Sequence, residues 1–348
     1  MKNKFLIIDN DYSRTSGSTK FIHQELDKIL DYDLIWDEKW SKSKNYDKKI
    51  LENYDNILFI HSFLSFKEIL KIQKKNIIWI PMFDSLYNLN QLNPYFWKSI
   101  KLLNIKIISF CDAITKICLN EKIDVFDIRY FLKTSENINY NLKKFNILFW
   151  DRGELKIKNW LKYFNKQDIE RITVIQRPDP RKKTSFISDK DKVDYNIDVK
   201  QIGYIEKEEY KKYLTSHNVY ICPRFREGIG ISYLEALSHG MFILGLDAPT
   251  MNEYIDNNKI GKFIKLNETE NIKLSLNEII QTQKNRENLN SEKYNIYKNK
   301  ILKVKYFLEK NKENNNIEYK NKIFILFYQN IYNFLFLIKR ILIKIKII

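Results

Sequence analysis

The stretch of sequence that decides the fold covers residues 218–246 and reads NVYICPRFREGIGISYLEALSHGMFILGL. Its two ends are short apolar runs of the kind that form buried strands, and the segment that begins near Ile231 is typical of a helix. A strand, a loop, a helix and a second strand make a βαβ unit, whose strands are parallel. The stretch therefore predicts a parallel α/β sheet.

The loop between the first strand and the helix contains two glycines. Gly228 and Gly230 let the backbone approach a ligand closely. The helix that begins near Ile231 points free N–H groups and the positive end of its dipole at the same place. The loop is therefore expected to hold a phosphate group without a metal ion.

Two glutamates lie in and after this loop. Glu227 lies in the loop and can accept hydrogen bonds from a sugar, whereas Glu235 lies on the helix and can reach a ribose diol. Either glutamate alone has a simpler explanation, because an acid near a helix N-terminus complements the helix dipole. Together with the glycine loop, the pair predicts a site that brackets a nucleotide sugar.

Outside this stretch, short apolar runs alternate with amphipathic segments, which indicates βαβ units and parallel sheets buried on both faces. A polar stretch separates two such series, so we expect an N-terminal domain over residues 1–142, a second domain over 143–316 and a tail over 317–348. Within the second domain, helix breaks are expected around Asn288 and Asn290 and at residues 314–316. The expected strands cover residues 5–9, 33–36, 56–60, 76–80, 105–109, 145–150, 172–175, 199–203, 218–223 and 241–246.

Two Rossmann-like domains of this kind are expected to face each other across a cleft. In open α/β sheets, ligands bind outside the carboxyl ends of the strands. The cleft between the domains is therefore the predicted active site.

The pattern of residues 227–235 resembles glycosyltransferase family 4, retaining enzymes of the GT-B fold whose signature is Glu-x7-Glu with an intervening glycine loop. Residues 248–255 and 257–261 are similar to the proline–glutamate helix and the glycine turn of the same family. The resemblance implies that Glu227 is a catalytic residue at the hydroxyls of the donor sugar and that Glu235 binds the nucleotide ribose. Sugar and phosphate would be bound by the backbone amides of Gly228, Ile229, Gly230 and Ile231.

The resemblance extends to residues outside the motif. After the first strand of the second domain, family members carry cations that stabilise the leaving diphosphate. Arg152 matches this pattern, and Lys158 fits it better than Lys156 does. Gly17 lies in a stretch similar to the family's glycine-bearing loop near the donor phosphate, although a plain turn before a helix explains it equally well. His61 follows an apolar strand, where a histidine can contact the donor or acceptor sugar or serve only the structure.

The 348 residues carry a net charge of +17, with 60 Lys and Arg residues against 43 Asp and Glu residues. Such an excess favours an anionic partner: a nucleic acid, an anionic lipid or a phosphorylated substrate. The basic residues are scattered along the chain and no nucleic-acid-binding motif accompanies them. We therefore expect no nucleic-acid partner.

Three cysteines without CxxC spacing indicate neither a disulfide framework nor a thiolate metal site. Asp9-Asn10-Asp11 and Asp189-Lys190-Asp191 look like the Asp-x-Asp metal motif of the other major glycosyltransferase architecture, but such short patterns often arise by chance. We expect no metal and no cofactor. The N-terminal residues become polar too soon for a signal peptide, so the expected location is the cytoplasm.

The tail contains a stretch, residues 323–338, that is almost entirely apolar and aromatic and is followed by Lys339, Arg340, Lys344 and Lys346. It is too short and too polar for a bilayer span of about 20 residues. Its amphipathic pattern is typical of a helix lying in an anionic membrane interface. The alternative is a terminal helix that packs on the protein core.

These observations predict a retaining glycosyltransferase at the inner face of the cell membrane. It would move a sugar from a nucleotide-sugar donor to a glycan or lipid-linked acceptor, as in the assembly of capsule, O-antigen or lipopolysaccharide. Two alternatives remain: a GT-B protein that binds a nucleotide sugar but hydrolyses it, epimerises it or leaves it unchanged, and a basic polyanion-binding protein.

Overall fold

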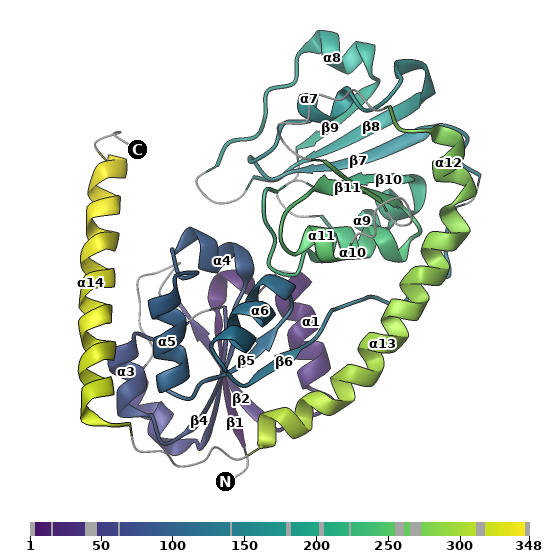
Figure 1. The fold of residues 1–348 in the computed structure, drawn as a ribbon. Helices are drawn as coiled ribbons and strands as arrows, with labels where there is room; N and C mark the ends of the chain where they lie inside the picture. The colour runs from purple at the N-terminus through teal and green to yellow at the C-terminus, as the bar shows by residue number, and fades with distance from the viewer. Residues whose placement is uncertain are drawn as a thin grey trace. The chain divides into compact units, whose positions relative to one another are not determined.

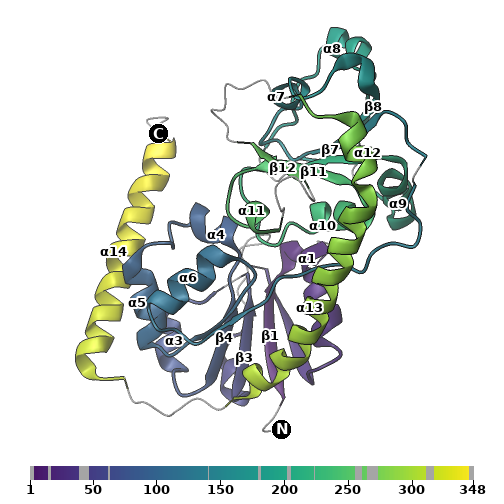
Figure 2. The same cartoon turned by 45° about the vertical axis from the view of Figure 1, so that its right-hand side comes forward.

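The computed structural model describes residues 4–14, 17–38, 47–61, 63–139, 141–178, 182–201, 205–222, 224–254, 261–264, 273–310 and 317–344. The chain divides into two compact units, one made of Met1–Ile128 with Lys300–Ile348 and the other of Arg129–Asn299 (Figure 1). Each unit contains a six-stranded parallel sheet (Figure 2). The predicted fold of two Rossmann-like domains is therefore confirmed.

The sheet of the first unit has the strand order β2-β1-β3-β4-β5-β6, and all its neighbours pair in parallel. The order reverses between β1 and β3, which makes this the switch point where open α/β sheets bind ligands. The strands are β1 (Phe5–Asn10), β2 (Tyr32–Asp37), β3 (Asn56–Ile60), β4 (Asn76–Ile80), β5 (Lys106–Ser109) and β6 (Val125–Asp127). The helices between them are α1 (Gly17–Leu26), α3 (Phe66–Lys71), α4 (Phe83–Asn88), α5 (Pro94–Leu102) and α6 (Asp112–Asn120), with 3-10 turns at Asp11–Ser13 and Lys48–Asn53.

Aromatic side chains fill the core between this sheet and the helices on one of its faces. The ring of Trp79 on β4 stacks on Phe63 at a centroid distance of 4.4 Å and on Trp97 of α5 at 6.3 Å. Phe66 of α3 and Phe96 of α5 join the same cluster, with their ring centroids 5.2 Å apart. Large aromatic side chains bury much apolar area each, so this cluster fixes α3 and α5 on the sheet.

The last helix of the chain, α14 (Tyr319–Lys344), lies beside α3 and α5 of the first unit (Figure 1). Ile325 is fully buried in the aromatic cluster. Gln329 accepts a hydrogen bond from the backbone N–H of Phe66 at 3.0 Å, and the Tyr332 hydroxyl donates to the Leu89 carbonyl at 2.6 Å. One face of α14 therefore packs on the protein, as the alternative interpretation of the tail expected.

Elsewhere on its surface, α14 carries large apolar side chains that remain exposed to solvent. These are Ile323, Leu326, Phe327, Ile331, Phe334, Leu335, Leu337 and Ile338. Among the helices that the structure describes, none is both long enough and apolar enough to cross a membrane.

The sheet of the second unit has the order β12-β11-β10-β7-β8-β9, again parallel throughout. It is the Rossmann order, with the switch point between β7 and β10. The strands are β7 (Phe145–Asp151), β8 (Ile169–Gln176), β9 (Ile197–Gln201), β10 (Val219–Ile221), β11 (Phe242–Leu246) and β12 (Gly261–Ile264). The helices are α7 (Lys158–Leu161), α8 (Asp189–Asp194), α9 (Lys207–Ser216), α10 (Ile231–Ser238), α11 (Met251–Tyr254), α12 (Leu276–Gln281) and α13 (Gln283–Glu309), with a 3-10 turn at Lys166–Asp168.

Every expected strand corresponds to an observed one, and the short strands β6 and β12 were not expected. Several predicted positions lie outside the described residues: 202, 203 and 223 of the expected strands, 255 of the proline–glutamate helix, 257–260 of the glycine turn, and the expected helix break at 314–316. The expected helix breaks around Asn288 and Asn290 are wrong, because α13 continues through both positions. Asn290 is fully buried there, and its side-chain amide donates to the Leu132 carbonyl at 3.0 Å and to the Thr134 hydroxyl at 2.9 Å.

Candidate functional site

The segments that follow three strands of the second unit come together at the carboxyl-terminal edge of its sheet. Arg152 follows β7, the loop with Glu227 follows β10, and Thr250 follows β11. Strands β7, β10 and β11 are neighbours in the sheet and run in parallel, so the segments that follow them share one edge. The site lies at the switch point, where this class of sheet binds its ligands.

The glycine loop owes its shape to Gly230, which caps the N-terminus of α10 in the left-handed region, at φ 74° and ψ 45°. A Cβ atom at this position would lie 1.9 Å from Cε1 of Tyr233. The Tyr233 hydroxyl donates a hydrogen bond to the Ile229 carbonyl at 3.0 Å. The ring of Tyr233 therefore packs directly against the backbone of the loop. Only glycine fits at position 230, because any side chain there would collide with this ring.

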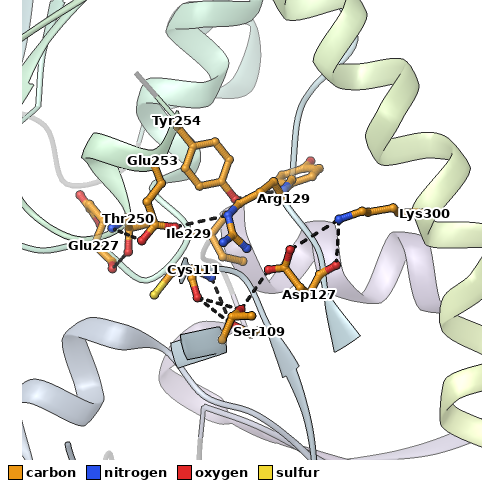
Figure 3. A network of polar contacts seen from close by, with 12 residues as sticks. Ser109, Cys111, Asp127, Arg129, Glu227, Ile229, Thr250, Glu253, Tyr254 and Lys300 are labelled. Atoms are coloured by element: carbon orange, nitrogen blue, oxygen red, sulfur yellow. Dashed lines mark hydrogen bonds and ion pairs between the residues drawn. The ribbon is translucent and has the colours of Figure 1, made fainter. Parts of the chain in front are cut away.

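Glu227 lies at the start of this loop and is 7% exposed. Its carbonyl accepts a hydrogen bond from the Thr250 hydroxyl at 2.7 Å, as Figure 3 shows. Its carboxylate lies 3.5 Å from Nη1 of Arg224. Thr250 is fully buried and has a φ of 76°, which is rare for a residue with a side chain. This backbone conformation is energetically unfavourable, so surrounding contacts must hold the segment after β11 in place.

The segment after β11 is itself anchored by α11. The Glu253 carboxylate accepts from the Thr250 backbone N–H at 3.4 Å and lies 3.3 Å from Nε of Arg129 (Figure 3). The Tyr254 hydroxyl accepts from the backbone N–H of Tyr130 at 3.0 Å. These contacts tie Thr250, and through it the Glu227 carbonyl, to the segment that contains Arg129 and Tyr130.

Glu235 lies one turn into α10 and is half-buried. The phenol of Tyr210, on α9, is close to it: burial, and in addition the negative charge of Glu235, raise the pKa of Tyr210 well above its ordinary value. The Tyr210 ring packs edge-on against Trp150 at 5.4 Å. Tyr210 therefore connects Glu235 to Trp150, which lies near the carboxyl end of β7.

The loop after β7 is organised by a carboxylate that the sequence analysis did not single out. Asp151 is fully buried and accepts hydrogen bonds from the backbone N–H of Gly153 at 2.8 Å and of Ser185 at 2.7 Å. Gly153 has a φ of 78°, and a Cβ atom there would lie 2.7 Å from the Lys183 carbonyl oxygen. The sequence signal for Asp151 was an aspartate at the end of a strand, followed by a glycine two residues later.

The two predicted cations behave differently. The Arg152 guanidinium lies over the Trp150 ring, 5.9 Å from its centroid, at the edge of the sheet where the glycine loop also begins. Lys158 is the first residue of α7 and is exposed. Arg152 thus lies next to the end of β7, and the donor-binding roles of both cations stay predictions.

Glu154 joins the loops after β7 and β10, and the sequence analysis missed it. Its carboxylate accepts from the backbone N–H of Phe225 at 2.9 Å, forms an ion pair with Lys182, and lies 3.7 Å from Nε of Arg224. Nothing in its sequence neighbourhood indicates this role, because its partners are far along the chain.

In the first unit, His61 follows β3 and therefore lies at the switch point of that sheet. Its Nδ1 atom is 3.1 Å from Oδ1 of Asp9, the buried carboxylate near the end of β1. Nε2 of His23, on α1, is 3.3 Å from the other oxygen of the same carboxylate. Burial by itself would raise the pKa of Asp9, but the hydrogen bonds from His23 and His61 lower it below its ordinary value.

Gly17, the other predicted residue of this unit, is the first residue of α1, and residues 15 and 16 before it lie outside the described part of the chain. Within the described ranges, no group of three or more His, Cys, Asp or Glu side chains is arranged to hold a metal ion.

Comparison with known proteins places this architecture. Residues 165–296 match the family model described as "Glycosyl transferases group 1". No curated protein matches the chain.

Three solved structures illustrate the likeness of fold. A glycosyltransferase from Rickettsia africae ESF-5 has 14% identity and a TM-score of 0.57, covering 89% of this chain and 100% of its own. WaaG, a glycosyltransferase involved in lipopolysaccharide biosynthesis, has 11% identity and a TM-score of 0.55, covering 88% and 99%. Sucrose-phosphate synthase from Thermosynechococcus elongatus has 12% identity and a TM-score of 0.52, covering 96% and 99%. The chain therefore has the GT-B fold, and its residues 165–296 match the glycosyl transferases group 1 family.

Proposed function

We propose that this protein is a retaining glycosyltransferase that moves a sugar from a nucleotide-sugar donor to a glycan or lipid-linked acceptor in cell-surface polysaccharide assembly. The observation that carries the proposal is the Glu227 loop at the switch point of the second sheet, with Gly230 opening the N-terminus of α10. The role of WaaG in lipopolysaccharide biosynthesis supports the choice of pathway class.

Different residues of the second unit would bind different parts of the donor. The amides of the 228–231 loop would bind the diphosphate, and Glu235 the ribose. Arg152, with Lys158, would stabilise the negative charge that develops on the leaving nucleoside diphosphate. Glu227, whose backbone is fixed by Thr250, would accept hydrogen bonds from the donor sugar hydroxyls.

In the proposed reaction the acceptor hydroxyl attacks the anomeric carbon on the face from which the diphosphate leaves, which retains the configuration. The bond from the anomeric carbon to the diphosphate oxygen breaks, the bond to the acceptor oxygen forms, and the leaving phosphate takes the acceptor proton. The scheme uses no metal and no cofactor.

The direct test is the variant Glu227→Gln, which keeps the shape of the side chain and removes its charge. We expect sugar transfer to fall by about 100-fold, because preorganised electrostatic contacts in a transition state are worth this much, while nucleotide binding stays intact. Glu278→Gln, at an exposed position of the same unit, is the matched control. If Glu227→Gln transfers sugar at the wild-type rate, the proposed role of Glu227 is contradicted. If the wild type hydrolyses the donor without transferring the sugar, the hydrolase alternative is favoured.

We further propose that α14 binds the chain to the inner face of the cell membrane as a peripheral protein. Its exposed face presents Phe327 and Phe334, each more than 60% exposed, among other apolar side chains. The sequence adds basic residues at both ends of the helix, and the whole chain carries a charge of +17. Apolar anchoring together with attraction to anionic headgroups is what holds an interfacial helix.

Vesicle co-sedimentation tests this attachment. We expect the wild type to bind vesicles of phosphatidylglycerol and phosphatidylcholine, to bind pure phosphatidylcholine weakly, and to lose most binding when Phe327 and Phe334 are changed to Ser. Phe186→Ser, at an exposed aromatic residue of the second unit, should bind as the wild type does. Unchanged binding by the double variant, or a dimer in solution that only this variant abolishes, contradicts the membrane proposal.

A further inference from the structure

The carboxylate of Asp9 lies at the switch point of the first sheet and is completely enclosed. It has no exposed surface, and three donors surround it. The backbone N–H of Asn10 donates to Oδ1 at 2.7 Å, the His61 ring contacts Oδ1 at 3.1 Å, and the His23 ring contacts Oδ2 at 3.3 Å. A buried carboxylate in this setting can touch no substrate, so any effect it has on one must pass through a histidine.

His61 is the histidine through which such an effect can pass. Its side chain is 19% exposed, so part of the ring reaches the surface of the unit. Its backbone lies in the left-handed region, at φ 56°, and is held there by a hydrogen bond from its N–H to the Ile80 carbonyl at 3.2 Å. Residues with side chains rarely adopt this conformation, and those that do cluster at ligand sites.

The contact with Asp9 determines the tautomer of His61. An ionised carboxylate only accepts hydrogen bonds, so Nδ1 of His61 must carry the proton. In the neutral imidazole, Nε2 is then an acceptor. A ligand atom at Nε2 must therefore be a donor, such as a hydroxyl.

His23 completes the enclosure of the carboxylate. Its ring packs against Trp36, with ring centroids 5.5 Å apart, and stacks on Tyr32 at 6.2 Å with an interplanar angle of 30°. With its imidazole so placed, His23 fixes the second oxygen of Asp9 and leaves Oδ1 aimed at His61. Although burial by itself would raise it, the pKa of Asp9 lies below its ordinary value because both histidines hydrogen-bond to it, so the carboxylate that faces His61 is ionised.

We propose that Asp9 is a positioning residue that fixes His61 as the Nδ1-protonated tautomer, so that Nε2 of His61 accepts a hydrogen bond from a sugar hydroxyl of the substrate. This assignment rests on the proposed function for its ligand. The tautomer itself does not depend on that function, so the two can fail separately.

Nitrogen-15 NMR of the histidine side chains tests the tautomer without any substrate. The chain has only four histidines, so the variants His23→Gln and His61→Gln assign the two relevant signals. We expect the His61 ring of the wild type to show a protonated Nδ1 and an unprotonated Nε2, and the Asp9→Asn variant to lose this preference. A wild-type His61 protonated at Nε2 overturns the proposal, even if Asp9→Asn does not fold.

A double-mutant cycle in sugar transfer tests the consequence. Asp9→Asn and His61→Ala should each lower kcat/KM about tenfold, the effect of one hydrogen bond. If Asp9 acts through His61, the double variant should be no worse than His61→Ala alone. Multiplying effects would show that Asp9 acts by another route and would overturn the proposal. A wild type without transferase activity would instead defeat the proposed function and the sugar ligand, and leave the tautomer to the NMR result.

Discussion

Several residues of the candidate sites lie in the left-handed backbone region that most side chains avoid. Gly230 and Gly153 adopt it at the ends of two neighbouring strands, where added Cβ atoms would collide with the protein. Thr250 and His61 adopt it despite their side chains. Strained backbone of this kind persists only where surrounding contacts fix it, and the hydrogen bonds to the Glu227 and Ile80 carbonyls supply such contacts.

The variant Gly230→Ala tests the glycine loop. The left-handed conformation alone costs an alanine about 1–2 kcal/mol, and the collision with the Tyr233 ring adds to this. We expect a lower free energy of unfolding and loss of donor binding, measured by urea denaturation and calorimetry. Gly228→Ala is the matched control for stability, because Gly228 does not have a positive φ. Equal stability of the two variants contradicts this account of the loop.

His217 predicts a pH dependence of stability. It is buried, and burial lowers its pKa from 6.5 to about 4, although it also contacts the Tyr213 carbonyl. Thr173 contacts its other nitrogen, at 2.8 Å. Because the folded-state pKa is the lower one, the unfolded chain binds the proton more readily. The stabilisation is complete above about pH 6.5 and is lost as the pH falls towards 4.

For the same histidine, we expect the free energy of unfolding to fall by about 2 kcal/mol between pH 7 and pH 5. Most carboxylates titrate below this window, which isolates the histidine contribution. Urea denaturation at the two pH values should show a clearly smaller loss for His217→Gln than for the wild type. An equal loss in the two proteins contradicts the assignment.

At the scale of elements, α14 has two faces with different roles. Ile325 is fully buried against the first unit, whereas Ile323, two residues earlier, is 51% exposed. We expect Ile325→Ala to lower the free energy of unfolding by about 2–5 kcal/mol, the usual cost of such a cavity, and Ile323→Ala by less than about 0.5 kcal/mol. Urea denaturation of the two variants decides. Similar losses would show that α14 does not pack on the core as described.

Apart from the short strands β6 and β12, the strands could be predicted from the sequence, because a parallel strand buried on both faces appears as an unbroken apolar run. The glycine loop and α10 could be predicted for a similar reason, since Gly228, Gly230 and the two glutamates lie within one short segment. The continuity of α13 could not. Asn290 looks like a helix breaker locally, but its amide is satisfied by Leu132 and Thr134, which are distant in sequence.

At the scale of the whole molecule, the two sheets differ in strand order but each brings polar residues to its own switch point. In the second unit, the glycine loop and its two glutamates lie within one short segment, so the sequence alone places them together. Asp9 is separated by 52 residues from His61 and by 14 from His23, and no local pattern joins the three. Likewise, Glu154 contacts Phe225 across 71 residues. Such partners emerge only once the strand order is known.

The central claim is that the switch point of the second sheet binds a nucleotide sugar through the loop and helix that carry Glu227 and Glu235. The most direct measurement is titration calorimetry of the wild type and of Glu235→Ala with UDP-, GDP-, ADP- and CMP-sugars. We predict that sugars of one nucleotide bind the wild type and that Glu235→Ala weakens this binding by at least about tenfold, through loss of hydrogen bonds to the ribose. Binding of no nucleotide sugar by the wild type, or equal binding by both proteins, would contradict the claim.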